Sequence, residues 1–321
     1  MVDGILPNIL VLIVSLLVLS KSSHIVITNA VKVSTATGFG KTTIGFLLVA
    51  FATSLPELLV AIFAALGHGT VGVAVGNVLG ANITNICLIL GVCILLSTLK
   101  GNRSISFTML ITKEEVGSLY FGLFMASIIP LILLYLKEAS QYIGVALLVL
   151  FIFNTYQLSK ERTSPKEEVP DRECAKVLPC LLLTLLGVIG VAGSAYFLID
   201  SASYIALALG VPSIVIGSTI VAFGTTVPEF ATSLQATRQG HLNLAFGNII
   251  GSGFVNLTCI LGVTLIASPF NVNISAFSSV AIFSLISNLL LWYFISNERI
   301  GWREGVMLVF LYSIFLIVSF S

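Results

Sequence analysis

The strongest constraint on the fold is a series of ten apolar stretches separated by short polar breaks. Each is at least about 18 residues long, the length that an α-helix needs to cross the hydrocarbon core of a bilayer. Their apolar residues are continuous rather than alternating, which favours helices over a β-barrel. Charged residues make up 9% of the chain, whereas soluble domains contain about 25%. The sequence therefore predicts an all-α membrane protein with ten transmembrane helices, at approximately residues 5–33, 42–66, 71–98, 115–136, 140–158, 178–209, 213–237, 242–267, 274–296 and 303–320.

A polar segment divides the predicted helices into two sets of five. Residues 159–177 hold five Lys and Arg residues among several acids, and this length is too short for a folded domain. The first five-helix half then covers residues 1–158, and the second covers residues 178–321. Because five is odd, the two halves enter the membrane from opposite sides.

The Lys and Arg residues indicate the orientation, because cytoplasmic loops of membrane proteins carry an excess of them. With the N-terminus outside, 13 of the 15 basic residues fall on the cytoplasmic side. The exceptions are Lys21, within the first stretch, and Lys137, in an outer loop. We therefore predict a multi-pass protein of the cell membrane, with its N-terminus outside and its central linker in the cytoplasm.

The two halves also repeat each other in sequence. Residues 44–57 align on residues 216–229 without a gap, with eight of fourteen positions identical, and both segments end in Pro-Glu. Residues 76–85 then align on residues 247–256 through a shared Gly-Asn start and a final Asn. An odd number of helices per repeat gives an inverted topology, and transporters built in this way bind their substrate near the midplane, where the repeats meet.

Each Pro-Glu pair places a carboxylate within an apolar stretch. A charged side chain costs about 2.5–3.5 kcal/mol at the centre of a membrane helix, so acids retained there mark functional sites. Pro56 and Pro228 lack the N–H group of a helix ladder and clash with the carbonyl group four residues back. Helices 2 and 7 are therefore predicted to be discontinuous beside Glu57 and Glu229, with free carbonyl oxygens facing a protein-lined cavity.

Oxygen atoms dominate the side chains near the two acids. A threonine lies one helical turn before each glutamate and is followed by a second hydroxyl residue, and the other aligned segment of each repeat ends in Asn. These residues are Thr53, Ser54 and Asn85 in the first half and Thr225, Thr226 and Asn256 in the second. Ca²⁺ takes about six to eight oxygen ligands in a flexible cage, which two carboxylates, two threonine carbonyl groups and water can supply, whereas Mg²⁺ requires a stricter octahedron. Sulfur and imidazole ligands for Zn²⁺ or Cu⁺ are missing from the motifs. The hydroxyl groups can instead hold Na⁺ with the same carboxylates, so that the two ions compete.

The paired Thr-(Ser/Thr)-hydrophobic-Pro-Glu motifs are each followed by Gly-Asn-x-x-Gly-(Ala/Ser)-x-x-x-Asn. This doubled pattern resembles the α-repeats of the cation/calcium antiporter superfamily. Within that superfamily the sequence is most similar to prokaryotic sodium/calcium exchangers, over both halves and the ten-helix layout. The resemblance implies secondary active exchange of Na⁺ for Ca²⁺ by alternating access, with helices 1 and 6 sliding over the others.

The resemblance also implies which residues bind the ions. Glu57 and Glu229 would ligate Ca²⁺ together with the backbone carbonyl groups of Thr53 and Thr225. Flanking Na⁺ sites would use the Ala50 carbonyl group, Thr53, Ser54 and Ser252 on one side, and the Ala222 carbonyl group, Thr225, Thr226 and Ala81 on the other. Asn85 and Asn256 would line the middle of the site.

The chain departs from the family pattern at three positions. Ala81 stands where the family has Ser, which removes a hydroxyl group and leaves the number of Na⁺ ions open. Asn256 stands where several microbial relatives carry Asp, and Ala52 replaces the more usual Gly. The proton/calcium branch is expected to carry a glutamate at the positions of Gly80 and Gly251, so its coupling chemistry is less favoured here.

Other functions are compatible with these features. The main alternative is an H⁺/Ca²⁺ antiporter of the same fold, because protons compete for two neighbouring carboxylates. A passive cation channel is a less favoured alternative. The apolar stretches contain no Ser/His or paired-Asp hydrolase constellation, so we predict neither an enzyme nor a cofactor. With a net charge of +1 no nucleic-acid partner is indicated, and we expect a monomer whose partners are Ca²⁺, Na⁺ and the lipid bilayer.

Other polar residues in the apolar stretches are assigned structural roles. Asn77 and Asn248 are predicted to form hydrogen bonds between helices rather than to ligate ions. Lys21 is expected to extend toward the cytoplasmic interface, and His24 to be a hydrogen-bonded histidine near the cytoplasmic half. The alternative is a role of these two residues in helix sliding or pH sensing. Asp200 is expected to lie at a solvated helix end.

Overall fold

The computed structural model describes residues 4–37, 53–68, 70–99, 105–106, 124, 127–133, 135, 141–161, 177–240, 242–268, 274–296 and 299–320. Its α-helices are α1 (Ile5–Thr37), α3 (Leu55–Ala65), α4 (Val71–Ile83), α5 (Gly91–Leu99), α7 (Gln141–Glu161), α8 (Val177–Leu209), α9 (Ser213–Ile216), α10 (Ala222–Thr225), α11 (Val227–Arg238), α12 (Leu242–Phe254), α13 (Leu261–Ala267), α14 (Ile274–Ser296) and α15 (Trp302–Ser319). Three π-helices continue them, η2 (Thr84–Leu90), η4 (Gly217–Val221) and η5 (Val255–Ile260). Two short strands, β1 (Ile105–Ser106) and β2 (Arg299–Ile300), pair antiparallel.

All ten predicted stretches contain helical residues, which confirms an all-α membrane fold. Within the described residues, six continuous helices are long and apolar enough to cross a membrane. The pair Ser213–Thr225 and Val227–Arg238, bent by 46°, makes a seventh, so the predicted break in helix 7 is confirmed. The shorter apolar helices α3 and α7 lie in predicted helices 2 and 5. Residues 42–52, the first part of helix 2, lie outside the described residues, as does most of the stretch at 115–136.

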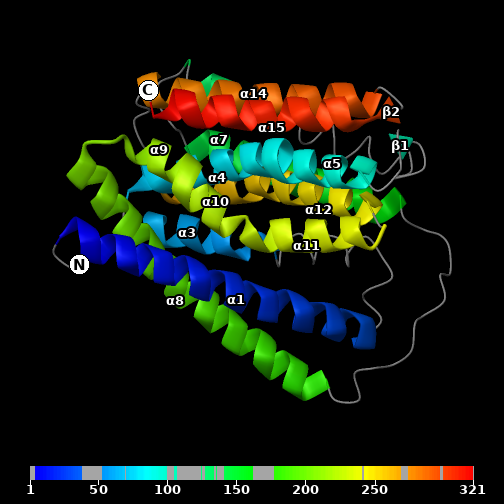
Figure 1. Ribbon diagram of the computed structural model, residues 1–321. Helices are drawn as coiled ribbons and strands as arrows, with labels where there is room; N and C mark the ends of the chain where they lie inside the picture. Colours follow the sequence, from blue (N-terminus) through cyan, green and yellow to red (C-terminus); the bar gives the residue numbers. More distant parts are fainter. Residues whose placement is uncertain are drawn as a thin grey trace.

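The ends of the chain lie at the same end of the molecule, as an even number of crossings requires (Figure 1). The opposite end contains the C-terminal ends of α1, α5 and α11, the start of α8, and the β1–β2 pair. The loops that adjoin these segments are the ones that the basic residues assign to a single side of the membrane. Which side faces the cytoplasm stays a prediction, and so do the boundaries at residues 158 and 178, because residues 162–176 lie outside the described part of the chain.

Helices α1 and α8 lie against each other along one flank of the molecule (Figure 1). Each has 33 residues, which corresponds to about 50 Å and exceeds the thickness of the hydrocarbon core, so both helices must tilt. They approach closely where α8 has glycine, since a Cβ atom added at Gly187 would lie 2.7 Å from Val26 Cγ2. Small residues at such contacts are typical of membrane helices.

A second close crossing joins the two repeats in the interior. Helix α4 of the first repeat crosses α9 and η4 of the second. A Cβ atom added at Gly76 or Gly80 would overlap the backbone of Ile214 or Ser218, and one added at Gly217 would overlap the backbone of Val73. The glycines of the aligned Gly-Asn segment therefore bring backbone against backbone, and this contact fixes the spacing of the segments that carry the candidate site.

We expect Gly80→Ala to destabilise the protein by about 1–3 kcal/mol, the usual cost of overpacking a tight contact. The matched control is Gly193→Ala in α8, where an added Cβ atom meets no atom within 4 Å. Thermal unfolding of the purified protein in detergent measures both variants. Equal midpoints for the two variants would contradict the assignment of Gly80 to the crossing.

Candidate cation site

Glu57 and Glu229 are both completely buried, and each lies in the first turn of a helix, α3 and α11 respectively. The two carboxyl groups lie close enough to interact electrostatically. Among the side chains that the structure describes, no Lys or Arg is buried beside the pair. Two buried carboxyl groups without such a partner are suited to a cation.

The sequence around each acid explains its position. The residue before each helix, Ser54 or Thr226, has nearly the same backbone geometry, with φ and ψ of −83° and 9° for Ser54 and −82° and 2° for Thr226. A proline occupies the first turn in both cases, as is common because its missing N–H group has no helical partner there. Pro228 leaves the carbonyl group of Gly224 without its usual helical donor. Each glutamate therefore sits at a helix N-terminus, where the helix dipole favours negative charge.

At the site, each glutamate lies beside a threonine from the opposite repeat. The hydroxyl group of Thr225, from the second repeat, lies beside the Glu57 carboxyl group of the first. The hydroxyl group of Thr53, from the first repeat, lies in turn beside the Glu229 carboxyl group. Each acid is thus enclosed by residues of both halves of the chain, as the inverted repeat predicts.

Ser252 of α12 connects three other residues of the site. Its hydroxyl group lies 2.9 Å from the Ser54 hydroxyl group, accepts a hydrogen bond from Asn85 Nδ2 at 3.2 Å, and lies within 3.3 Å of Glu229 Oε1. These contacts join residues of α3, α11, α12 and η2 on one side of the carboxylate pair.

The other side of the pair lacks this network. The position equivalent to Ser252 is Ala81, which is buried but has no hydroxyl group. Neither side-chain polar atom of Asn256, the equivalent of Asn85, has a hydrogen-bond partner within the described structure. The Thr226 hydroxyl group instead donates to the carbonyl group of Ala222, at 2.9 Å. The site is therefore asymmetric at positions 81 and 252, where only the second repeat has a hydroxyl group.

Several oxygen atoms at the site have no donor. Within the described part of the chain, the following buried atoms lack a hydrogen-bond partner: Glu57 Oε1 and Oε2, Glu229 Oε2, Asn85 Oδ1, Asn256 Oδ1 and Nδ2, and Asn77 Nδ2. A buried polar atom without a partner costs about 1–3 kcal/mol. Five of these seven atoms are oxygens, the atom type that hard cations such as Ca²⁺ take as ligands. No cluster of three or more His, Cys, Asp and Glu residues occurs among the described residues, so neutral oxygens must complete any cation's coordination.

The backbone is irregular beside both asparagines. The π-helix η2 begins one residue before Asn85, and η5 begins one residue before Asn256. Such segments are rare in proteins and are frequent at functional sites. From the sequence, breaks are predicted only at the prolines, because a π-helix leaves no proline or glycine signature in the chain.

The structure brings together nearly all of the residues that were predicted to form the site. Glu57, Glu229, Thr53, Thr225, Ser54, Ser252 and Asn85 share direct contacts, Thr226, Ala222, Asn256 and Ala81 are buried beside them, and Ala50 lies outside the described residues. Whether these residues bind ions stays a prediction.

Two neighbours of the site received no site role from the sequence. Asn77 Oδ1 accepts a hydrogen bond from the Thr225 hydroxyl group at 2.9 Å, so the predicted interhelical bond of Asn77 orients a site residue. Leu16 of α1 packs so tightly on Gly224 that a Cβ atom there would overlap it. Leucine in an apolar helix gives no sequence signal for such a contact. The bond of Asn248 to Ser233 at 3.1 Å likewise confirms its predicted role between helices.

An all-α membrane fold whose two repeats meet at buried carboxylates defines an inverted-repeat cation transporter. The chain belongs to the family described as sodium/calcium exchanger protein, whose profile matches residues 7–159 and 180–321. Membership of this family establishes a cation/Ca²⁺ antiporter.

Similar proteins and structures agree with this assignment. The sodium/calcium exchanger MaX1 of Methanosarcina acetivorans is 31% identical over 98% of each chain. The uncharacterized membrane protein MJ0091 of Methanocaldococcus jannaschii is 32% identical over 84% of each chain. The structure of the sodium-calcium exchanger NCX_Mj is similar with a TM-score of 0.65, at 28% identity, over 97% of this chain and 98% of that one. The H⁺/Ca²⁺ exchanger CAX shares the fold with a TM-score of 0.80 at 17% identity, over 98% of this chain and 86% of that one.

We expect Glu57→Gln and Glu229→Gln each to weaken Ca²⁺ binding at least roughly 30-fold, because losing one charge of a buried charged contact costs about 2–5 kcal/mol. Isothermal titration of the purified protein with Ca²⁺ measures the effect. Asp200→Asn in α8 is the matched control, since Asp200 lies outside the site and should leave the affinity unchanged. Wild-type affinity in either glutamate variant would refute the site.

Proposed function

We propose that the protein exchanges Na⁺ for Ca²⁺ across the cell membrane by alternating access. The observation that supports this most strongly is the pair of fully buried, interacting carboxyl groups of Glu57 and Glu229, with no buried basic residue among the described side chains. Their combined charge of −2 when ionised matches one divalent cation. Ca²⁺ accepts an irregular cage of carboxylate, carbonyl and water oxygens, whereas Mg²⁺ does not.

In this proposal Ca²⁺ binds between the two carboxylates and the backbone carbonyl groups of Thr53 and Thr225. Na⁺ binds the same carboxylates with neutral oxygens on the flanks. The flank formed by Ser54, Ser252 and Thr53, with the Ala50 carbonyl group, has its hydroxyl groups already gathered around Glu229. Sharing of the carboxylates makes the two ions exclude each other, which exchange requires.

The opposite flank offers fewer oxygens to Na⁺. Ala81 supplies none, and the carbonyl group of Ala222 accepts hydrogen bonds from the Thr225 and Thr226 hydroxyl groups, at 3.3 and 2.9 Å. A Na⁺ ion on this flank must displace these bonds and depends on Asn256 for a further oxygen. We therefore expect weaker Na⁺ binding on this flank.

H⁺/Ca²⁺ exchange is the second candidate, and the shared fold with the exchanger CAX favours it. The packing of Gly80 favours Na⁺ instead. A side chain at position 80 would overlap the backbone of Ser218, so a third carboxylate has no room at this position. The relative MaX1 is named a sodium/calcium exchanger and matches the whole length of this chain.

The proposed topology has the N-terminus outside and the linker in the cytoplasm, in a monomer that needs no cofactor. This topology is supported by Figure 1, in which the C-terminal ends of α1, α5 and α11 lie at the same end of the molecule as the start of α8. Alternating access by motion of α1 and α8 is supported by their packing, which is chiefly against each other.

Proteoliposomes that contain the purified protein distinguish the coupling ions. We expect an outward Na⁺ gradient to drive uptake of radioactive Ca²⁺, and a pH gradient without Na⁺ to drive none. Uptake driven by the pH gradient alone would instead support H⁺/Ca²⁺ exchange. Ca²⁺ flux that does not respond to Na⁺ or H⁺ on the other side would indicate a channel.

Ala81→Ser should increase the apparent affinity for Na⁺ by roughly 2- to 10-fold, because the new hydroxyl group supplies one ligand, worth about 0.5–1.5 kcal/mol. By the repeat alignment, the new hydroxyl group is also expected to be a hydrogen-bond partner for Asn256, as Ser252 is for Asn85. Ala74→Ser, at a buried apolar position of the same helix, is the matched control. The measurement is the Na⁺ dependence of Ca²⁺ uptake, and an unchanged dependence in Ala81→Ser would argue against a Na⁺ ion beside residue 81.

A further inference from the structure

The buried face of α11 is polar for two turns beyond Glu229. The buried residues of this helix are Pro228, Glu229, Ser233 and Thr237, and the last three follow one another at intervals of four residues. A helix of this length normally turns an apolar stripe toward the protein interior. The polar stripe extends about 12 Å from Glu229 toward the end of the helix.

The equivalent face of α3 is apolar. After Glu57 its buried residues are Val60, Ala61 and Ala64. In the alignment of the two repeats, Ala61 is equivalent to Ser233, and Ala65 is equivalent to Thr237. Helices α3 and α11 begin with the same motif and carry equivalent acids, but their buried faces differ in polarity beyond the site. Packing alone does not explain this difference, because an alanine fills the equivalent position in the first repeat.

Oxygen atoms near the start of the stripe have no donor. Ser233 Oγ accepts a hydrogen bond from Asn248 Nδ2 at 3.1 Å, which directs the Asn248 amide toward α11. The remaining Asn248 oxygen, Oδ1, is buried without a hydrogen-bond partner within the described structure, and so is Glu229 Oε2 one turn away. An amide oxygen, a hydroxyl oxygen and a carboxylate oxygen thus lie within about one helical turn.

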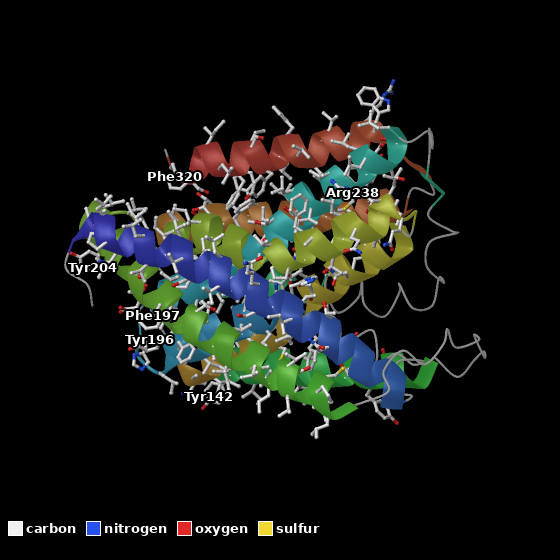
Figure 2. The ribbon with its side chains drawn as sticks, turned by 60° about the horizontal axis from the view of Figure 1, so that its bottom comes forward. Tyr142, Tyr196, Phe197, Tyr204, Arg238 and Phe320 are labelled. Carbon is white, nitrogen blue, oxygen red and sulfur yellow. The ribbon has the colours of Figure 1, made fainter. Side chains whose placement is uncertain are left out.

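The stripe continues to the end of the helix. Thr237 donates to the carbonyl group of Ser233 at 2.8 Å and lies beside the Cys93 thiol group of α5. Arg238, the last residue of α11, is exposed at the end of the molecule opposite Tyr204 (Figure 2). The polar positions therefore reach from the carboxylate pair to the surface at this end.

We propose that Ser233, Thr237 and Asn248 line the route by which cations reach Glu229 from the side of the membrane at which α11 ends, with a transient cation site formed by Ser233 Oγ, Asn248 Oδ1 and Glu229 Oε2. This inference rests on the proposed function. The neutral oxygens replace part of the ion's hydration shell yet bind too weakly to retain it, which suits a step on a path. The first repeat has no such stripe, so a cation at the other face approaches Glu57 by a different route. The three side chains are buried here, and the route requires them to hydrate when the exchanger opens to this face.

The test is exchange of Ca²⁺ for Ca²⁺ in proteoliposomes of defined orientation, which needs no assumption about the coupling ion. We expect Ser233→Ala and Asn248→Leu to raise the Ca²⁺ concentration for half-maximal flux by roughly 2- to 10-fold at the face where α11 ends, the effect of losing one ligand. The other face, and equilibrium Ca²⁺ binding in detergent, should not change. Ala61→Ser, at the equivalent position of α3, is the matched control and should leave the face where α11 ends unchanged.

Equal effects on both faces, a changed equilibrium affinity, or wild-type flux in both variants would overturn the route. No Ca²⁺ flux in the wild-type protein would overturn the proposed function itself. Cys93 provides a second measurement that removes no polar residue. In a protein whose other cysteines are replaced by alanine, a membrane-impermeant cationic thiol reagent should modify Cys93 only from the face where α11 ends. Modification from the opposite face, or none during turnover, would contradict the route.

Discussion

Two carboxyl groups buried close to each other in the interior are the constraint on which the rest of the structure depends. Glu57 and Glu229 interact electrostatically and are shielded from water, and several of their neighbours either favour negative charge or leave an oxygen atom without a donor. Each proline lies in the first turn of a helix, which places the acid that follows it at a helix N-terminus. The exchange of threonine neighbours between the repeats surrounds each acid with residues of the other half. In the proposed function, a cation bound between the two acids would therefore contact both halves of the chain.

The sequence was sufficient for much of this arrangement because the repeated motif is physically restrictive. Proline cannot continue a helix, and a carboxylate in an apolar stretch needs a counter-charge, so Pro-Glu predicts both the break and the site. The part played by Ser252 came only from the resemblance, because no spacing rule connects it to Ser54 or Asn85. The π-helices at Asn85 and Asn256 were not predicted, since their residues have ordinary helical propensities. The contact of Leu16 with Gly224 could not be predicted, because which face of α1 meets the core depends on the packing of α8 against it.

The differences between the repeats are as informative as their similarity. At the level of the acids and prolines the halves are equivalent, so neither direction of transport is favoured there. Beside the acids, Ser252 of the second repeat forms a hydrogen bond with Asn85. The equivalent residue of the first repeat is Ala81, and Asn256 has no hydrogen-bond partner within the described structure. Beyond the acids, one helix turns a polar face to the interior and its counterpart an apolar face. The difference between the repeats thus increases with distance from the two acids. A transporter built in this way can have different access routes on its two membrane faces while it keeps one binding geometry.

The glycine crossing of α4 with α9 and η4 has a mechanical consequence. Because the contact at Gly76, Gly80 and Gly217 is between backbones, no side-chain rotation can lengthen or shorten it. The spacing between α4 and the segment that contains α9 and η4 is therefore set by the backbones themselves. In the proposed exchange, this contact leaves movement to helices that lie outside it, such as the long pair α1 and α8 along the flank.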